Sequence, residues 1–157
     1  MSVEPFDRRP AHLTGEWVGE NRLWLSPDQP ARVSDTTATI TPAARDQGLL
    51  IRYTWEDEGA PQAGVILVQY TRKGVVTAAW TDAWHMSGTV MFCRGAIDGK
   101  GQIVADGSYA APPGPDWGWR IGLEPAGEDG FILRMFNMTP EGEIPPAVEA
   151  RYTRKRG

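Results

Sequence analysis

The chain has 157 residues, about the length of one ordinary domain, so no second domain is expected. Its 16 basic and 20 acidic residues give a net charge of -4, which argues against a nucleic-acid partner because phosphate binding needs an excess of Lys and Arg. No apolar run approaches the roughly 20 residues that span a bilayer, and the N-terminus lacks the apolar core of a signal peptide. We therefore expect a cytoplasmic protein without membrane insertion.

Eighteen glycines and thirteen prolines divide the chain into short segments. Residues 1–14 have no clean period, and we interpret them as a lead-in or short helical turn before a single domain at 15–157. From Gly15 onward the apolar residues recur at period two, which is typical of strands that are buried on one face. Ten runs are predicted as strands: Gly15–Leu25, Asp35–Thr41, Leu49–Glu58, Gly64–Thr71, Val75–His85, Thr89–Ile97, Ile103–Tyr109, Trp117–Glu124, Phe131–Met138 and Ala147–Arg154.

The links between these runs are short and rich in glycine, as in Arg72-Lys73-Gly74 and Glu128-Asp129-Gly130. Such links join adjacent antiparallel strands, and none has room for an amphipathic helix of about 12 residues, so a parallel sheet is not expected. A sheet of about ten strands must split into a sandwich or close on itself. The short hairpins favour an all-β fold with a single closed, antiparallel, up-and-down barrel, and a sandwich is the alternative.

The first predicted strand contains Gly15-Glu16-Trp17, and the last contains Arg151 and Arg154. The triplet resembles the Gly-x-Trp start of the calycin superfamily, the lipocalins and fatty-acid-binding proteins, which lay an arginine of the last strand across this tryptophan. The resemblance implies a cation–π contact between Trp17 and Arg154, of the kind worth roughly 0.5 to 2 kcal/mol. The segments Trp80–His85 and Trp117–Arg120 are also similar to a bacterial family of lipocalin-like proteins of uncharacterised function. This likeness extends over residues 13–154.

The fifth run, Val75–His85, alternates between two faces. We place the bulkier and more apolar face inside the barrel, where Asp82 lies between the indoles of Trp80 and Trp84. A buried carboxylate is costly unless it is paired or hydrogen-bonded. Its candidate partners are Arg120, Arg134 and Arg52. The inward face then consists of Val76, Ala78, Trp80, Asp82 and Trp84.

Two interpretations of Asp82 and Arg120 stay open. In the first, the pair is the polar pole of a cavity and orients a small ligand, which favours a ligand with an acidic group. In the second, it is a structural ion pair that pins two strands. Met135 and Asn137 in the ninth run are further candidates to line the cavity, although packing explains them equally well. The body of the ligand would pack on Tyr53, Trp55, Trp80, Trp84 and Tyr152.

Asp82 and His85 together suggest general acid–base catalysis, but a spacing of three residues on a regular strand places them on opposite faces, about 10 Å apart. A bulge near Met86-Ser87-Gly88 would be needed to join them, and a histidine at the rim, hydrogen-bonded to a loop, is the preferred interpretation. Cys93 lies in mid-strand, where a small buried hydrophobic residue is expected rather than a nucleophile.

Metal ligands of the softer kinds are limited to His12, His85 and Cys93, so we predict no metal site. Haem held by His85 alone has very weak support, because a single histidine without a motif is not diagnostic. No phosphate-binding loop, dinucleotide fingerprint or Gly-x-Ser-x-Gly elbow is present, and no cofactor is predicted.

Three functions remain as hypotheses. The leading one is non-catalytic binding of a small, largely apolar or acidic ligand inside the barrel. The second is an enzyme that uses Asp82, assisted by His85 or Arg120, on an enclosed substrate. The third is a barrel filled by its own side chains that acts through its outer surface, as a homodimeric interaction module.

Overall fold

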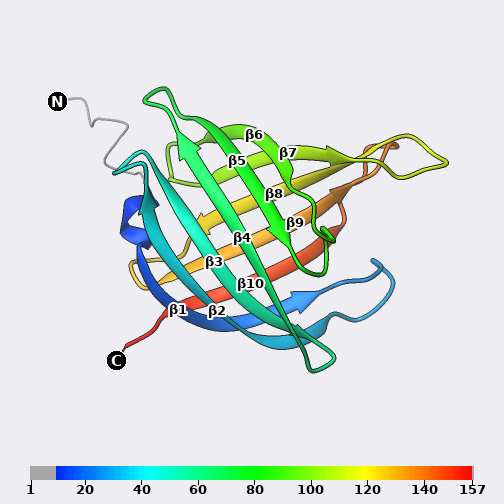
Figure 1. The fold of residues 1–157 in the computed structure, drawn as a ribbon, viewed down its shortest axis with the longest axis horizontal. Helices are drawn as coiled ribbons and strands as arrows, with labels where there is room; N and C mark the ends of the chain where they lie inside the picture. The colour runs from blue at the N-terminus through cyan, green and yellow to red at the C-terminus, as the bar shows by residue number, and fades with distance from the viewer. Residues whose placement is uncertain (1–9, 157) are drawn as a thin grey trace.

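The computed structural model describes residues 10–156, so most of the expected lead-in at 1–14 lies outside the described residues. A four-residue 3-10 turn, η2 (Pro10–Leu13), precedes ten antiparallel strands, as Figure 1 shows. The strands are β1 (Gly15–Leu23), β2 (Arg32–Ala43), β3 (Gly48–Asp57), β4 (Ala60–Tyr70), β5 (Val75–Asp82), β6 (Met91–Ile97), β7 (Ile103–Tyr109), β8 (Trp117–Pro125), β9 (Gly130–Met138) and β10 (Pro146–Arg154).

Every strand pairs with its neighbour in the chain, and β1 also pairs with β10, so the sheet closes into a barrel. Closure gives each strand two hydrogen-bonded neighbours and removes the exposed edges that an open sheet would present. The predicted up-and-down barrel is confirmed, and the sandwich alternative is wrong. Among residues 10–156, no helix has the length and hydropathy of a membrane span.

The barrel has two different ends. We call the end with the links 24–31, 58–59, 83–90, 110–116 and 139–145 the open end; these links lie toward the right in Figure 1. The opposite, closed end carries the links 44–47, 71–74, 98–102 and 126–129, together with η2 and the last residues of β10. An up-and-down order forces this division, because each strand returns the chain to the opposite end.

Two strand ends differ from the prediction for identifiable reasons. β5 ends at Asp82 instead of His85, because the Asp82 carboxylate accepts the backbone N–H groups of Trp84 and His85 and turns the chain out of the sheet. β4 begins at Ala60 instead of Gly64, because the link 58–59 is a two-residue turn with positive φ at both positions. Such turns match the twist of the flanking strands, so pairing continues up to the turn.

Aromatic side chains fill the closed end. The Trp17 and Phe131 rings meet edge to face with centroids 4.8 Å apart, and Phe131 stacks on Tyr152 at 4.5 Å. The Trp17 Nε1 donates a hydrogen bond of 2.9 Å to the carbonyl of Leu13 in η2. Trp17 and Phe131 are each 1% exposed, so this layer seals the barrel at the end where the chain enters.

The predicted contact between Trp17 and Arg154 is confirmed. The two residues are partners in the β1–β10 register, and the Arg154 guanidinium lies 4.3 Å from the indole centroid. The same guanidinium donates 2.9 Å hydrogen bonds to the carbonyls of Thr14 and His12. Arg154 thus joins the last strand to the first strand and to η2, which stabilises closure.

We expect Arg154→Met to lower the free energy of unfolding by about 2 kcal/mol, because it removes the cation–π contact and leaves the carbonyls of His12, Thr14 and Glu128 without their donor. Arg151→Met is the matched control. Its side chain is 60% exposed and pairs with Glu149, so the loss should stay below about 0.5 kcal/mol. Urea unfolding followed by circular dichroism measures both variants, and equal midpoints would contradict the assigned role of Arg154.

Candidate functional site

The open end contains a pocket with a volume of about 360 Å³. Among the described residues, its lining contains no Lys, Arg, Asp or Glu. Aliphatic, methionine and small polar side chains contribute part of the wall. The remaining wall consists of six ring-bearing residues: Trp24, Trp80, Trp84, His85, Tyr109 and Trp119.

Two stacked indoles form the buried part of this pocket. Trp80 on β5 and Trp119 on β8 lie nearly parallel, with centroids 5.2 Å apart and an angle of 6° between the ring planes. Tyr109 meets Trp119 edge to face at 6.4 Å, and its hydroxyl donates a 2.6 Å hydrogen bond to Asn137 Oδ1. Strand alternation directs both indoles inward, where each is almost completely buried.

His85 lies among the indoles of the pocket, although it belongs to a link and not to a strand. Burial lowers the pKa of its imidazole, and the negative charge of Asp82 only partly opposes this. Within residues 10–156, only its backbone N–H is hydrogen-bonded, so both ring nitrogens are available to a ligand. Its ring centroid is 4.6 to 5.8 Å from those of Trp55, Trp80, Trp84 and Trp119.

The carboxylate of Asp82 fixes the positions of the residues around His85 through hydrogen bonds. Its Oδ2 accepts hydrogen bonds from the Tyr53 hydroxyl at 2.6 Å and from Trp55 Nε1 at 3.2 Å. Its Oδ1 accepts the backbone N–H groups of Trp84 at 2.8 Å and His85 at 3.0 Å. Both oxygens act only as acceptors, which is the pattern of an ionised carboxylate. Asp82 is 2% exposed, and its four donors are all neutral.

Gly64 makes the Tyr53–Asp82 contact possible. It is the register partner of Tyr53 on β3 and of Asp82 on β5, so it stands between the two side chains. A Cβ at this position would lie 2.2 Å from the Tyr53 ring. The missing side chain lets the tyrosine cross β4 and reach the carboxylate. Burial, followed by the charge of Asp82, raises the pKa of Tyr53 well above its usual value, so the hydroxyl remains a donor.

The expected Asp82–Arg120 pair does not form. Arg120 binds Asp106 on the outer wall with two hydrogen bonds of 2.8 and 3.0 Å. The physical reason is the alternation of β8, because Trp119 points inward and its neighbour must point outward. The other two proposed partners of Asp82 are not among its donors either: Arg134 binds Glu124 and Glu149, and Arg52 is exposed.

The prediction that Asp82 and His85 lie on opposite faces is also wrong. Because the chain turns after Asp82, the His85 backbone returns to the carboxylate and its ring enters the pocket. Trp84, expected to face inward, is 36% exposed and lies at the rim of the pocket. Its Nε1 donates a 3.0 Å hydrogen bond to Asp57 Oδ2 at the end of β3.

Below the pocket, the described residues enclose a much smaller space. A second internal space measures about 10 Å³, which is room for about one water molecule. The sequence candidates therefore separate into two groups. Trp80, Trp84, His85 and Asn137 line the open-end pocket, whereas Tyr53, Trp55, Asp82, Met135 and Tyr152 line the small internal space, to which His85 also contributes.

Some residues of the pocket were not identified from the sequence. Trp119 could have been, because Trp119, Ile121 and Leu123 alternate at period two and all three are buried. Met86 and Thr89 lie in the link 83–90, where no strand periodicity indicates which side chains point into the barrel. Their place in the wall depends on the turn that Asp82 creates.

Cys93 and metal binding are the remaining chemical features that the sequence raised. Cys93 is buried, as expected, and burial followed by the charge of Asp106 raises its pKa to about 11, which disfavours the thiolate. The part of the chain that the structure describes has no group of three or more His, Cys, Asp or Glu residues that could hold a metal ion.

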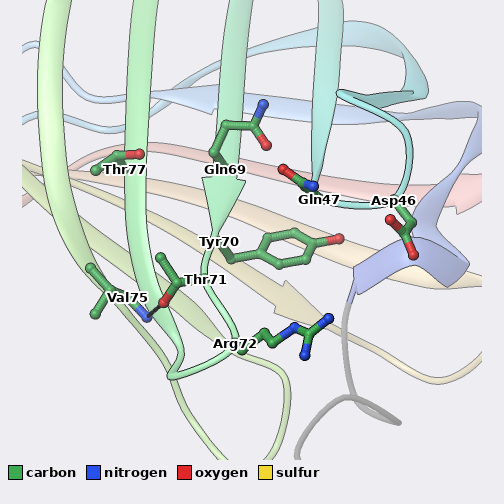
Figure 2. A pocket seen from close by; sticks show the side chains of 8 residues that line it. All are labelled: Asp46, Gln47, Gln69, Tyr70, Thr71, Arg72, Val75 and Thr77. Carbon is green, nitrogen blue, oxygen red and sulfur yellow. Dashed lines mark hydrogen bonds between the residues drawn. The ribbon is translucent and has the colours of Figure 1, made fainter.

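A pocket of about 510 Å³ lies near the closed end, and Figure 2 shows its side chains. The Tyr70 ring lies between the turn of Asp46 and Gln47 and the side chain of Arg72. The other residues that line this pocket are polar or small, with charges of both signs. The open-end pocket, which is aromatic and uncharged, is therefore the better candidate for a ligand of the predicted apolar kind.

We expect Tyr53→Phe to cost about 1 to 3 kcal/mol of stability, because the lost hydroxyl donates to Asp82 and accepts from Trp80 Nε1 at 2.9 Å. The change in volume is small. Tyr109→Phe is the control: its hydroxyl bonds Asn137 in a partly buried position, and we expect a loss below about 1 kcal/mol. Urea unfolding tests the pair, and an equal loss in both variants would argue against the special role of Asp82.

His85 should make stability depend on pH. Folding lowers its pKa from the ordinary value of 6.5, so the unfolded chain binds the proton more readily. The contribution of the neutral imidazole to the stability of the protein is complete above about pH 6.5. It declines as the pH falls below this value. We expect His85→Gln to show a flatter decline than the wild type between about pH 7 and about pH 5.5 in urea unfolding. His12→Gln, in η2, is the control and should keep the wild-type slope; equal slopes in all three proteins would refute the assignment.

Solved structures with similar barrels are known. The chain matches the crystal structure of Rv2717c from M. tuberculosis with a TM-score of 0.67 and 14% sequence identity, over 99% of this chain and 100% of that one. It matches the S-type phycobiliprotein lyase CPES from Guillardia theta with a TM-score of 0.60 and 11% identity, over 100% and 99% of the two chains. At these identities the likeness concerns the fold.

No curated protein matches the sequence. The model of a family described as a protein of unknown function, DUF1579, matches residues 9–154. Because this match includes nearly the whole barrel, the chain belongs to the DUF1579 family.

Proposed function

We propose that this protein binds a small, planar and largely apolar molecule in its open-end pocket. The observation that carries the proposal is the uncharged aromatic wall around about 360 Å³, with the stacked Trp80 and Trp119 at its buried part. Ligand sites commonly have volumes of about 300 to 1,000 Å³, apolar walls and a few polar groups. Flat indole faces favour a ligand with a flat ring system.

Polar groups that could orient the ligand are also present. The Trp119 Nε1–H is buried and has no hydrogen-bond partner among the described residues. Such an unpaired donor costs about 1 to 3 kcal/mol, so an acceptor on a ligand or an ordered water would stabilise it. The ring nitrogens of His85 and the side chain of Asn137 provide further polar contacts in the wall.

The proposal moves the ligand from the centre of the barrel to its open end, because the centre has room for about one water. A calycin-type barrel is part of the same proposal, supported by Gly15-Glu16-Trp17 and by the Trp17–Arg154 contact. The likeness to a phycobiliprotein lyase is compatible with a ligand-binding role.

The two alternatives receive less support. The enzyme hypothesis needs an accessible Asp82, but this carboxylate is engaged by four donors and does not line the open-end pocket. The homodimer hypothesis would use the outer wall, where Phe92 is 77% exposed. That surface is separate from the pocket, so pairing with a second copy would not compete with ligand binding.

A titration with the neutral aromatic dye N-phenyl-1-naphthylamine tests the proposal. We expect the dye to quench tryptophan fluorescence and Trp119→Leu to weaken its binding about tenfold, because one face of the stack is lost. Trp117→Leu is the matched control: it removes an indole two residues away on β8 that does not line the pocket. Circular dichroism checks that both variants fold, and equal affinities or no quenching would contradict the proposal.

A further inference from the structure

Charge is distributed unevenly between the two ends of the barrel. The links of the open end contain no Lys or Arg, whereas the links of the closed end contain four basic and four acidic residues. The nearest guanidinium to the open-end links, that of Arg32 at the start of β2, is already bound to Asp57 and Glu58. The open-end links contain five acidic residues: Asp28, Glu58, Asp116, Glu141 and Glu143.

Two carboxylates contact residues of the pocket wall, and one of them, Asp57, is also paired with Arg32. Trp84 donates its indole N–H to the carboxylate of Asp57, and His85 donates its backbone N–H to the carboxylate of Asp82. Within residues 10–156, Asp82 has no cationic partner, because its donors are two aromatic side chains and two backbone groups. A buried negative charge behind an uncharged wall makes the electrostatic potential in the pocket negative.

The wall itself offers the surface that organic cations prefer. Indole faces carry a negative quadrupole and attract ammonium groups, most strongly where water is excluded. Trp84 lies at the rim, and the stacked Trp80 and Trp119 lie at the buried part, so indoles border the pocket over its whole depth. An anionic ligand would meet no Lys or Arg in this wall.

We propose that the ligand of the open-end pocket is a hydrophobic organic cation, in which an aromatic body carries an alkylated ammonium group. This inference rests on the proposed function and names the class of ligand that the site selects. The aromatic body packs against Trp80 and Trp119, and the ammonium group lies against the Trp84 face, toward the acidic links. Alkylation suits such a site, because an alkylated ammonium has fewer bonds to water to lose than a primary one.

Three ligands that share a 2-naphthylmethyl body test the charge preference: (2-naphthylmethyl)trimethylammonium, its neutral carbon isostere 2-neopentylnaphthalene, and the smaller anion 2-naphthylacetate. Binding is measured by quenching of tryptophan fluorescence at low salt. We expect the cation to bind about tenfold more tightly than the neutral isostere, and the anion to bind most weakly. Added salt should lower the affinity for the cation and leave the affinity for the isostere unchanged.

Charge-neutralising variants locate the effect. Glu141→Gln combined with Glu143→Gln removes two charges of the open end, and we expect cation affinity to fall about threefold with no change for the isostere. Glu16→Gln combined with Glu128→Gln is the matched control, because it removes two exposed charges at the closed end. Trp84→Leu should reduce cation affinity more than isostere affinity, since leucine keeps an apolar surface without a π face.

The outcomes separate this inference from the proposed function. If the isostere binds as tightly as the cation, or the anion binds best, the cation preference is wrong and the aromatic pocket remains a ligand site. If none of the three ligands binds, both proposals are overturned. An equal effect of the open-end and closed-end variants would also overturn the inference, because it would reflect net charge alone.

Discussion

The buried carboxylate of Asp82 accepts four hydrogen bonds, and each comes from a neutral donor. A charge at 2% exposure persists only if these bonds replace its lost water, so the surrounding residues are constrained in type and position. Tyr53 must cross the bare backbone of Gly64, and the chain after Asp82 must turn back to present two N–H groups. The turn then places Trp84 and His85 over the barrel, which creates the pocket wall.

The closed end follows a different principle. There the first and last strands meet, and Trp17, Phe131 and Tyr152 pack ring against ring in a layer that leaves little space. Arg154 covers the layer and bonds the carbonyls before β1, so its charge is satisfied at the surface. One end of the barrel thus provides stability through dense aromatic packing. The other end contains the aromatic pocket, with Trp84 partly exposed at its rim, and is the end where we propose that a ligand binds.

The fold was predictable because it depends on features that are local in the sequence. Period-two alternation and short glycine links specify hairpins, and the ten strands that they join close a barrel. The same alternation placed Val76, Ala78, Trp80 and Asp82 inside correctly. It failed beyond Asp82, because a side chain bonded to the following backbone ended the strand, and periodicity does not register such a bond. The inward placement of Arg120 was wrong because side chains alternate along β8, and its neighbour Trp119 occupies the inward position.

The outward position of Arg120 bears on the class of ligand that we propose. An inward Arg120 paired with Asp82 would have neutralised the interior and offered a guanidinium to an acidic molecule. In the structure Arg120 is held by Asp106 outside, and Asp82 keeps its charge among neutral donors. Burial at the same time lowers the pKa of His85, so this imidazole adds no positive charge at neutral pH. The aromatic wall and the unpaired charge of Asp82 therefore support our proposal of a cationic ligand over the acidic one that the sequence first suggested.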